Sequence, residues 1–301
     1  MKKINTLELA RRRNTRVAAA CFLAPALLIM VVFILYPIID SFIMSFLRWK
    51  GSTPRNRATF TGLANWFKLG TDPIFWKAFG NNIVIMFLSL LFQVPFAMAL
   101  ATFLDQGGKK TVVFKVVWFL PYLISSVAIG VLFRFGLDAN MGMFAAISKA
   151  FGGGSVDLLG NPKSALYTVI GVVCWQYIPF YMVLYLAAYG TIPVELFEAA
   201  TIDGATHNQY FWRVALPLLK PTIISGATIS IIGSLKYFDL IFVMTGGGPG
   251  TATEIMATYM FRTSFRMNDM GYGATIACGM FILITIIAST VVSTLNKRAE
   301  V

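Results

Sequence analysis

Six long apolar blocks, separated by more polar segments, constrain the fold of this chain more than any other feature. A helix needs about 20 mainly apolar residues to cross the roughly 30 Å of hydrocarbon in a membrane. Blocks of this length cover residues 17–47, 83–104, 112–135, 165–189, 222–244 and 273–295. We therefore predict an all-α integral membrane protein with about six transmembrane helices, in which Pro95, Pro121 and Pro179 bend or break their helices.

The composition agrees with burial in lipid. Apolar residues make up 57% of the chain and charged residues only 13%, about half the charged share of a soluble protein. The formal net charge of +12 would suggest nucleic-acid binding if the protein were soluble. Here the basic residues lie mainly between the apolar blocks, as is typical of charge that flanks membrane spans. We therefore expect a lipid bilayer around the chain and no nucleic-acid partner.

Basic residues predict the orientation of the chain. Residues 1–16 resemble the start of a secretion signal, but the apolar run that follows is too long for a signal core and no clear small-residue cleavage site appears. We expect a retained first helix, a cytoplasmic N-terminus and a transmembrane domain over residues 17–301. Six crossings place further segments in the cytoplasm, and the basic residues of two of them agree with this orientation: Lys109, Lys110, Lys297 and Arg298. The first external loop disagrees, because it carries Arg48, Lys50, Arg55, Arg57, Lys68 and Lys77.

Residue types that usually carry catalysis or metal binding are scarce and scattered. Cys21, Cys174 and Cys278 each lie inside an apolar block, where a buried or lipid-facing side chain is expected. One histidine, His207, is too few for a histidine-based metal site. Three consecutive glycines at 246–248 lack the Lys-Ser/Thr pair of a phosphate-binding loop. We predict no catalytic residue, no metal and no cofactor on this chain, so its energy must come from elsewhere.

The segment 190–221 is more polar than its neighbours and has the features of a docking element. It reads GTIPVELFEAATIDGATHNQYFWRVALPLLKP. Pro193 suits a helix start, and the helix dipole favours Glu195 and Glu198 in the first turns. Gly204 permits the chain to turn, after which a second helical stretch returns it to the membrane.

Two interpretations of this helix-turn-helix follow from its residues. The small face of its first helix suits a groove on another protein, where Glu198 and Asp203 would meet basic residues. The alternative is an interfacial helix that lies on the lipid headgroups. The shape alone leaves both interpretations open.

The residues of this segment resemble a known motif. Glu198-Ala199-Ala200, followed by Gly204 and by Leu216-Pro217, is similar to the EAA loop of binding-protein-dependent ABC importer permeases. In that family the short helix is the coupling helix, which docks into a cleft of the cytoplasmic ATPase subunit. The resemblance implies a cytoplasmic loop between the fourth and fifth spans. The implied coupling residues are Glu198, Ala199, Ala200, Asp203 and Gly204.

Two further stretches resemble the carbohydrate importers of that group. The first is similar to their FD…TGGP signature and contains Tyr237-Phe238-Asp239 and the outer-loop residues Thr245, Gly246, Gly247, Gly248 and Pro249. The second is similar to GLxNY…D…FW…N and contains TGLANW at 61–66, Asp72, Phe75-Trp76 and Asn81-Asn82. The chain departs from the pattern by one extra glycine and by Asn82, where Thr is frequent. The resemblance spans about 24–295 and is closest to six-span members of the maltose/lactose/glycerol-phosphate group.

The resemblance also implies partners for the tasks that this chain lacks. A second permease would complete a heterodimer, and two cytoplasmic ATPase subunits would bind ATP and Mg²⁺. An external solute-binding protein would deliver a sugar. The assembly would lie in the cell membrane of a prokaryote, with both termini of this chain in the cytoplasm.

By the same resemblance, the sugar path lies between the fourth and fifth spans. The nominated residues are Gln176, Tyr177, Phe180, Ser230, Ser234 and Tyr237. Amides, hydroxyls and aromatic faces suit a hydroxyl-rich solute, but each of these side chains can equally serve helix packing. Lys236 and Asp239 are charges within the expected fifth span, so we expect them to pair across one turn, face a cavity or reach the interface.

Other solutes and another class of transporter remain as alternatives. Glycerol phosphate, a polyol, an amino acid or an inorganic anion would suit the same kind of importer, and Lys236 is the one basic candidate deep in a span for a phosphate. A secondary transporter would need coupling-ion carboxylates at the midplane and two related halves, and a membrane enzyme would need converging polar groups. The sequence shows neither clearly.

Overall fold

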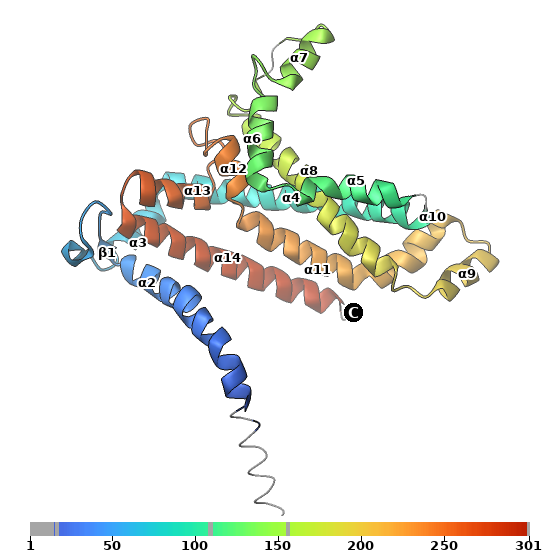
Figure 1. Cartoon of the computed structure of the whole chain (residues 1–301), viewed down its shortest axis with the longest axis horizontal. Helices are drawn as coiled ribbons and strands as arrows, with labels where there is room; N and C mark the ends of the chain where they lie inside the picture. The colour runs from blue at the N-terminus through green and yellow to red at the C-terminus, as the bar shows by residue number, and fades with distance from the viewer. Residues whose placement is uncertain (1–14, 16–17, 108–110, 155–156, 300–301) are drawn as a thin grey trace, which may run out of the picture. The chain divides into compact units, whose positions relative to one another are not determined.

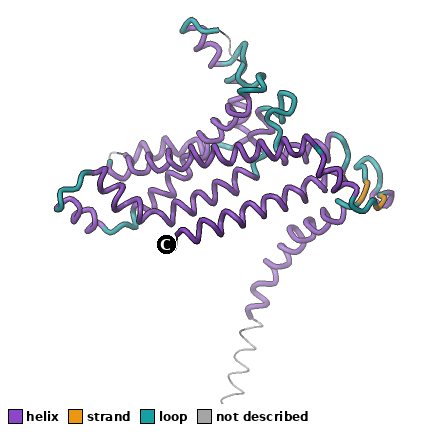
Figure 2. Tube along the Cα trace, turned by 180° about the vertical axis from the view of Figure 1, so that it is seen from behind, coloured by secondary structure: helices purple, strands orange, loops and turns teal. Residues whose placement is uncertain are grey.

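The computed structural model describes residues 15, 18–107, 111–154 and 157–299 (Figure 1). Its described part contains five helices long and apolar enough to cross a membrane, or six when the bent helix pair is taken as one span. Figure 2 shows the course of the helices. The chain divides into two compact units, residues 1–70 with 263–278 and residues 71–262 with 279–301. The predicted basic residues of the N-terminus, together with Lys109 and Lys110, lie outside the described residues, as do the side chains of Lys297 and Arg298.

The first unit begins with a span, Ala18–Met44, which has no buried side chain in its most apolar part. This helix passes through a π-helical turn, η1 (Val31–Leu35), into α2 (Tyr36–Met44). A short hairpin of β1 (Leu47–Arg48) and β2 (Thr59–Phe60) follows, with η2 (Arg55–Arg57) between the strands and α3 (Ala64–Thr71) after them. The all-α prediction missed this hairpin, whose strands are too short to show an alternating pattern.

The hairpin is held by side chains of the same unit. The Asn65 amide donates hydrogen bonds to the carbonyl oxygens of Ser45 and Leu47, each at 3.0 Å. Arg55 forms an ion pair with Asp40. The unit also contains η5 (Arg262–Arg266), apart from its first residue, and the start of α14 (Met270–Ala299). The basic first loop is therefore a folded structure rather than a simple connection.

The second unit is built on three helices that lie side by side in both ribbon views, α4 (Pro73–Gln106), α8 (Ala165–Tyr189) and α11 (Leu216–Leu235) (Figures 1 and 2). Helix α4 starts at Asp72, whose side chain accepts hydrogen bonds from the backbone N–H groups of Ile74 and Phe75. The remaining helical elements are α5 (Val112–Leu123), α6 (Ser126–Gly136), α7 (Met143–Ala150), α9 (Val194–Ile202), α10 (His207–Tyr210), η4 (Phe211–Ala215), α12 (Asp239–Met244) and α13 (Met256–Phe261).

The third expected span is not one straight helix. Helices α5 and α6 meet at 90°, and the backbone at Ile124 and Ser125 is extended between them. This break lies three residues beyond Pro121. Of the predicted bends or breaks, no break occurs at Pro95 or Pro179, because α4 and α8 continue through them. A single missing N–H is tolerated where neighbouring helices hold the remaining turns in place.

The fifth span ends earlier than predicted. Helix α11 stops at Leu235, and α12 starts only at Asp239. Lys236 and Asp239 are therefore outside the span, and the described residues show no ion pair between them. Each charge instead lies at the helix end that favours its sign, since Lys236 follows the C-terminus of α11 and Asp239 begins α12.

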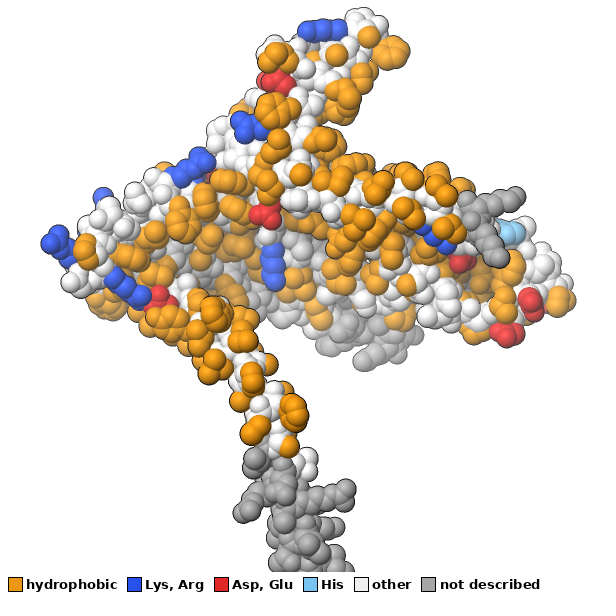
Figure 3. Space-filling view, in the orientation of Figure 1, with side chains coloured by type: hydrophobic (Ala, Val, Ile, Leu, Met, Phe, Trp, Pro, Cys, Tyr) orange, Lys and Arg blue, Asp and Glu red, His pale blue; other side chains and the backbone are white. Residues whose placement is uncertain are grey.

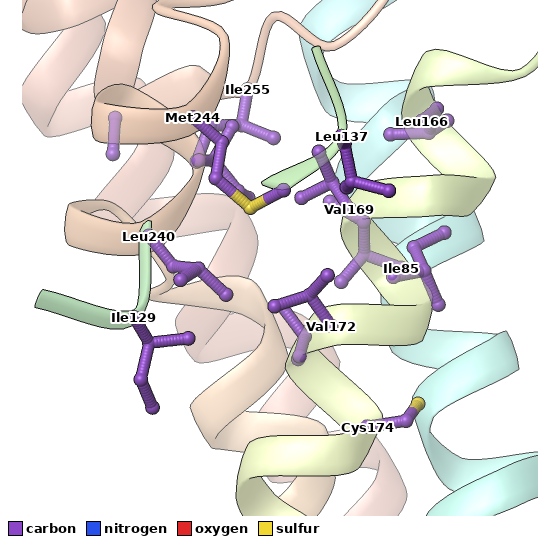
Figure 4. Packing of buried hydrophobic residues seen from close by; sticks show 14 residues of the cluster. Ile85, Ile129, Leu137, Leu166, Val169, Val172, Cys174, Leu240, Met244 and Ile255 are labelled. Atoms are coloured by element: carbon purple, nitrogen blue, oxygen red, sulfur yellow. The ribbon is translucent and has the colours of Figure 1, made fainter. Parts of the chain in front are cut away.

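Apolar packing holds α4, α8 and α12 of the second unit together. Figure 4 shows Ile85 of α4, Val169 and Val172 of α8, and Leu240 and Met244 of α12 facing one another. Outside this core, hydrophobic side chains cover much of the visible helix surface (Figure 3). Apolar surface on this scale is what lipid or partner helices cover.

Candidate functional site

Helix α9 projects from the rest of the second unit. It begins after Pro193, as predicted, and none of its residues is buried. The Glu198 side chain is exposed, and the alanines after it leave a face without bulk. Ile202, the last residue of the helix, is 86% exposed. The helix thus presents exposed carboxylate, small and apolar groups together.

The turn after α9 has a defined geometry. Gly204 has φ +75, and no described atom lies within 4 Å of where its Cβ would be. Within this chain, the backbone conformation rather than close packing therefore favours glycine here. Thr206 and Gln209 then form a capping box that starts α10. Phe197 packs its ring against Tyr210, with the ring centroids 5.1 Å apart. Asp203, predicted to contact a partner, is exposed at the end of α9.

An aromatic cavity of about 310 Å³ lies between α5, α8 and the end of α11. Of the nominated path residues, Tyr177, Phe180 and Tyr237 line it. Tyr122 of α5 completes the aromatic wall, with its ring centroid 5.2 Å from that of Phe180 and 6.0 Å from that of Tyr177. Sequence reasoning missed Tyr122, although it directly follows Pro121. Lys236 and Asp239 also line this cavity.

The other three nominated residues are buried beside the cavity rather than lining it. The Gln176 amide donates to Ser126 Oγ at 3.0 Å. Ser230 Oγ donates to Gln93 Oε1 at 2.8 Å, and Ser234 Oγ donates to the Ser230 carbonyl at 2.7 Å. In this conformation Gln176 and Ser230 join neighbouring helices, which is the packing role that the sequence left open, whereas Ser234 bonds within its own helix.

The outer-loop signature folds into a tight structure stabilised by hydroxyl groups. Gly246 and Gly247 adopt positive φ values of 59° and 95°. Thr253 Oγ1 donates to the Gly248 carbonyl at 2.7 Å and lies 2.7 Å from Thr245 Oγ1. Pro249 follows a cis peptide bond. Among the described residues, Asp239 forms no hydrogen bond with this loop.

Two neighbouring amides attach this loop to α4. Asn81 Nδ2 donates to the carbonyl oxygens of Ala252 at 3.1 Å and Glu254 at 2.8 Å. Asn82 Oδ1 accepts from the Met256 N–H at 3.0 Å, while its Nδ2 lies 3.4 Å from the Leu235 carbonyl oxygen. Asn82 thus bridges the C-terminal end of α11 and the N-terminal end of α13, where backbone groups lack partners within their own helices. The family pattern drew attention to these amides, but their contacts were not predictable.

Glu254 is a buried carboxylate beneath the same loop. Its Oε1 accepts a hydrogen bond from Thr258 Oγ1 at 2.8 Å. Its Oε2 lies 2.9 Å from Arg262 Nη2 but outside hydrogen-bonding geometry. Burial raises the pKa of the Glu254 carboxyl, and the Thr258 hydrogen bond and the Arg262 charge oppose that rise. Within the described residues no group of three His, Cys, Asp or Glu side chains could hold a metal ion.

The family model described as "binding-protein-dependent transport system inner membrane component" matches residues 73–301. The chain belongs to this family. The match begins at the first residue of α4 and includes α9, the aromatic cavity and the outer loop. As an inner membrane component, the chain is a multi-pass membrane protein.

Relatives of this inner membrane component match it over most of both chains. The arabinooligosaccharides transport system permease protein AraP of Bacillus subtilis is 32% identical over 284 residues, 93% of this chain and 88% of the relative. The multiple sugar-binding transport system permease protein MsmF of Streptococcus mutans is 32% identical over 282 residues, 93% of this chain and 95% of the relative.

A solved structure shares the fold of this inner membrane component. It is a chain from a bacterial ABC transporter involved in the import of the acidic polysaccharide alginate, with a TM-score of 0.83 and 24% sequence identity. The likeness covers 97% of this chain and 98% of the other. The arrangement of helices described above is therefore one that an ABC transporter uses.

Proposed function

We propose that this chain is the permease subunit of an ABC importer that carries a sugar across the membrane and receives its energy through α9. The observation that carries the proposal is the exposure of this helix, which has no buried residue. Its side chains are too apolar to favour water, yet Glu198 and Asp203 disfavour hydrocarbon. A groove with basic residues on an ATPase subunit satisfies both demands.

A sugar is the solute that the aromatic cavity suits best. Rings from α5, α8 and the end of α11 supply flat apolar faces, and Lys236 and Asp239 supply a donor and an acceptor for hydroxyl groups. The names of the relatives AraP and MsmF support a carbohydrate. The path residues proposed to meet it are Gln176, Tyr177, Phe180, Ser230, Ser234 and Tyr237, with Tyr122 added.

The proposed assembly places α9 and both termini in the cytoplasm and the outer loop outside. A second permease subunit completes the pathway, and two ATPase subunits bind ATP and Mg²⁺, so this chain needs no cofactor of its own. An external solute-binding protein delivers the sugar. The solved alginate transporter was also obtained in complex with an alginate pentasaccharide-bound periplasmic protein, which supports such a partner.

ATPase activity of the reconstituted complex, with and without sugar-loaded binding protein, tests the proposal. We expect stimulation in the wild type and its loss in Glu198→Ala/Gly204→Trp, because the bulky side chain and the missing carboxylate remove the contact that transmits the energy. The complex must still assemble, which size-exclusion chromatography shows.

The chain offers a matched control for the glycine change. Gly152 has φ +77 and, like Gly204, has no described atom within 4 Å of its Cβ position. Gly152→Trp therefore introduces the same strain and bulk on what the proposal places as the opposite side of the membrane. We expect Gly152→Trp to retain stimulation. Unchanged stimulation in the α9 variant would mean that α9 is only an interfacial helix.

A further inference from the structure

A second cavity, of about 600 Å³, opens at the outer end of the second unit. Its walls come from the first turns of α4, from the segment before α8 together with the first turn of α8, and from the outer loop. The lining residues are Lys77, Asn81, Pro162, Lys163, Leu166, Tyr167, Pro249, Thr251 and Ala252. None of these residues lines the aromatic cavity, so the two spaces are separate.

The charge of this outer cavity has one sign. Lys77 and Lys163 are exposed lining residues, and no Asp or Glu lines it. Neither lysine takes part in an ion pair within the described residues. Two ammonium groups without counter-charges attract an anionic group, and the Tyr167 side chain adds a hydroxyl group to the lining.

One wall of the cavity is firmly built. Asn81 is only 3% exposed, and its amide donates to the Ala252 and Glu254 carbonyl oxygens. This contact fixes the loop that carries Pro249, Thr251 and Ala252 against α4. The next residue, Asn82, contacts both the end of α11 and the start of α13. A partner that contacts this wall therefore touches a segment next to Asn82. Asn82 in turn contacts Leu235, the last residue of α11, two residues before Tyr237.

We propose that the outer cavity receives a carboxylate side chain from the external solute-binding protein. This inference rests on the proposed function, because that function supplies the external partner. A protein carboxylate fits better than a lipid, since two lysines, an amide and a hydroxyl group make much of the lining polar. It also fits better than the transported solute, because the cavity shares no lining residue with the aromatic cavity.

The test uses the complete complex in nanodiscs of neutral phosphatidylcholine, with the solute-binding protein that stimulates it. In Lys77→Glu/Lys163→Glu, the concentration of binding protein that gives half-maximal ATPase stimulation should rise about ten-fold or more at low ionic strength. At about 1 M salt the half-maximal concentration of the variant should approach that of the wild type, because charges are then screened within about 3 Å. Hexaglutamate peptide should compete with the binding protein on the wild type, and hexaglutamine should not.

Two further variants separate docking from folding. Lys149→Glu reverses an exposed charge on α7, outside the cavity, and should leave the half-maximal concentration unchanged. Lys77→Gln/Lys163→Gln removes the charges without placing carboxylates in the cavity, and should give a smaller rise of the same kind. All variants should keep the basal ATPase rate and the assembled size of the wild type.

Other results would overturn the inference and name another occupant. An unchanged half-maximal concentration in the double reversal would mean that the binding protein does not use this cavity. A defect seen only with phosphatidylglycerol in the nanodiscs would indicate an anionic headgroup, and a shift only in the solute concentration dependence would indicate an acidic solute. Absence of stimulation in the wild type by any binding protein would instead reject the proposed function, before the variants are compared.

Discussion

Gly247 lies where both backbone conformation and packing exclude a side chain. Its φ is +95, and an added Cβ would lie 2.8 Å from Glu254 Oε2 and 2.9 Å from Glu254 Cδ. Alanine therefore adds left-handed strain and pushes on a buried carboxylate held by Thr258. We expect Gly247→Ala to lower the free energy of unfolding by about 2–4 kcal/mol, seen as a lower Tm in detergent.

Gly250 provides the control for this change. It also has a positive φ, +61, but nothing lies within 4 Å of its Cβ position. Gly250→Ala should therefore cost only the backbone strain, about 1–2 kcal/mol. Equal losses for the two variants would show that the contact with Glu254 has no energetic weight.

Glu254 should make stability depend on pH. Burial raises its pKa in the folded protein, above the unfolded value of about 4.3. Its contribution to folding is therefore full below about pH 4.3 and is lost as pH rises through the folded pKa. Glu254→Gln stays neutral throughout, so the Tm of the variant relative to wild type should rise between about pH 4 and pH 7. A Tm difference that is constant with pH would contradict the raised pKa.

Two tyrosines on α8 differ in whether their hydroxyl groups have partners. Tyr189 OH lies 2.7 Å from Thr102 Oγ1, whereas the buried Tyr185 OH has no hydrogen-bond partner among the described residues. Tyr189→Phe should destabilise the protein by about 1 kcal/mol, and Tyr185→Phe should be neutral or stabilising by up to about 1 kcal/mol. Thermal unfolding of both variants gives the comparison, and a clear loss in Tyr185→Phe would contradict it.

At the scale of elements, Asp72 connects two helices of the second unit. One oxygen caps the start of α4, and the other accepts a 2.6 Å hydrogen bond from Tyr259 OH of α13. Asp72→Ala should therefore cost about 2–4 kcal/mol, more than Tyr259→Phe alone. Because the two changes remove the same hydrogen bond, the double variant should lose less unfolding free energy than the sum of the losses in the two single variants. Additive losses in thermal unfolding would show that the bond contributes nothing.

The elements themselves were only partly predictable. The length of the apolar runs identified the spans well, because a run of about 20 apolar residues is typical of a helix that crosses a membrane. The exact position of the break at Ile124–Ser125 and the early end of α11 at Leu235 were not predicted, because each lies inside a long block that was interpreted as one span. Pro121 indicated a disturbance nearby, but Pro95 and Pro179 carry the same local signal and leave their helices continuous. Neighbouring helices decide which prolines coincide with a break.

At the scale of the whole molecule, the proposed orientation can be tested with matched glycines. After replacement of the native cysteines by serine, Gly152→Cys should react with a membrane-impermeant maleimide in intact spheroplasts. Gly204→Cys should react only after permeabilisation. Both positions are exposed and have nothing near their Cβ positions, so access to the reagent is the remaining difference. The reverse labelling pattern would invert the proposed topology.

The sequence by itself determined the class of protein, the approximate spans and the exposed helix at 194–202. These follow from local properties: apolar length, a proline at a helix start and a glycine in a turn. Only the tertiary structure decided which polar residues line a cavity and which hold helices together. Tyr177 and Phe180 line the aromatic cavity while Gln176 and Ser230 are buried beside it, because that choice depends on helix rotation and on side chains distant in sequence, such as Ser126 and Gln93.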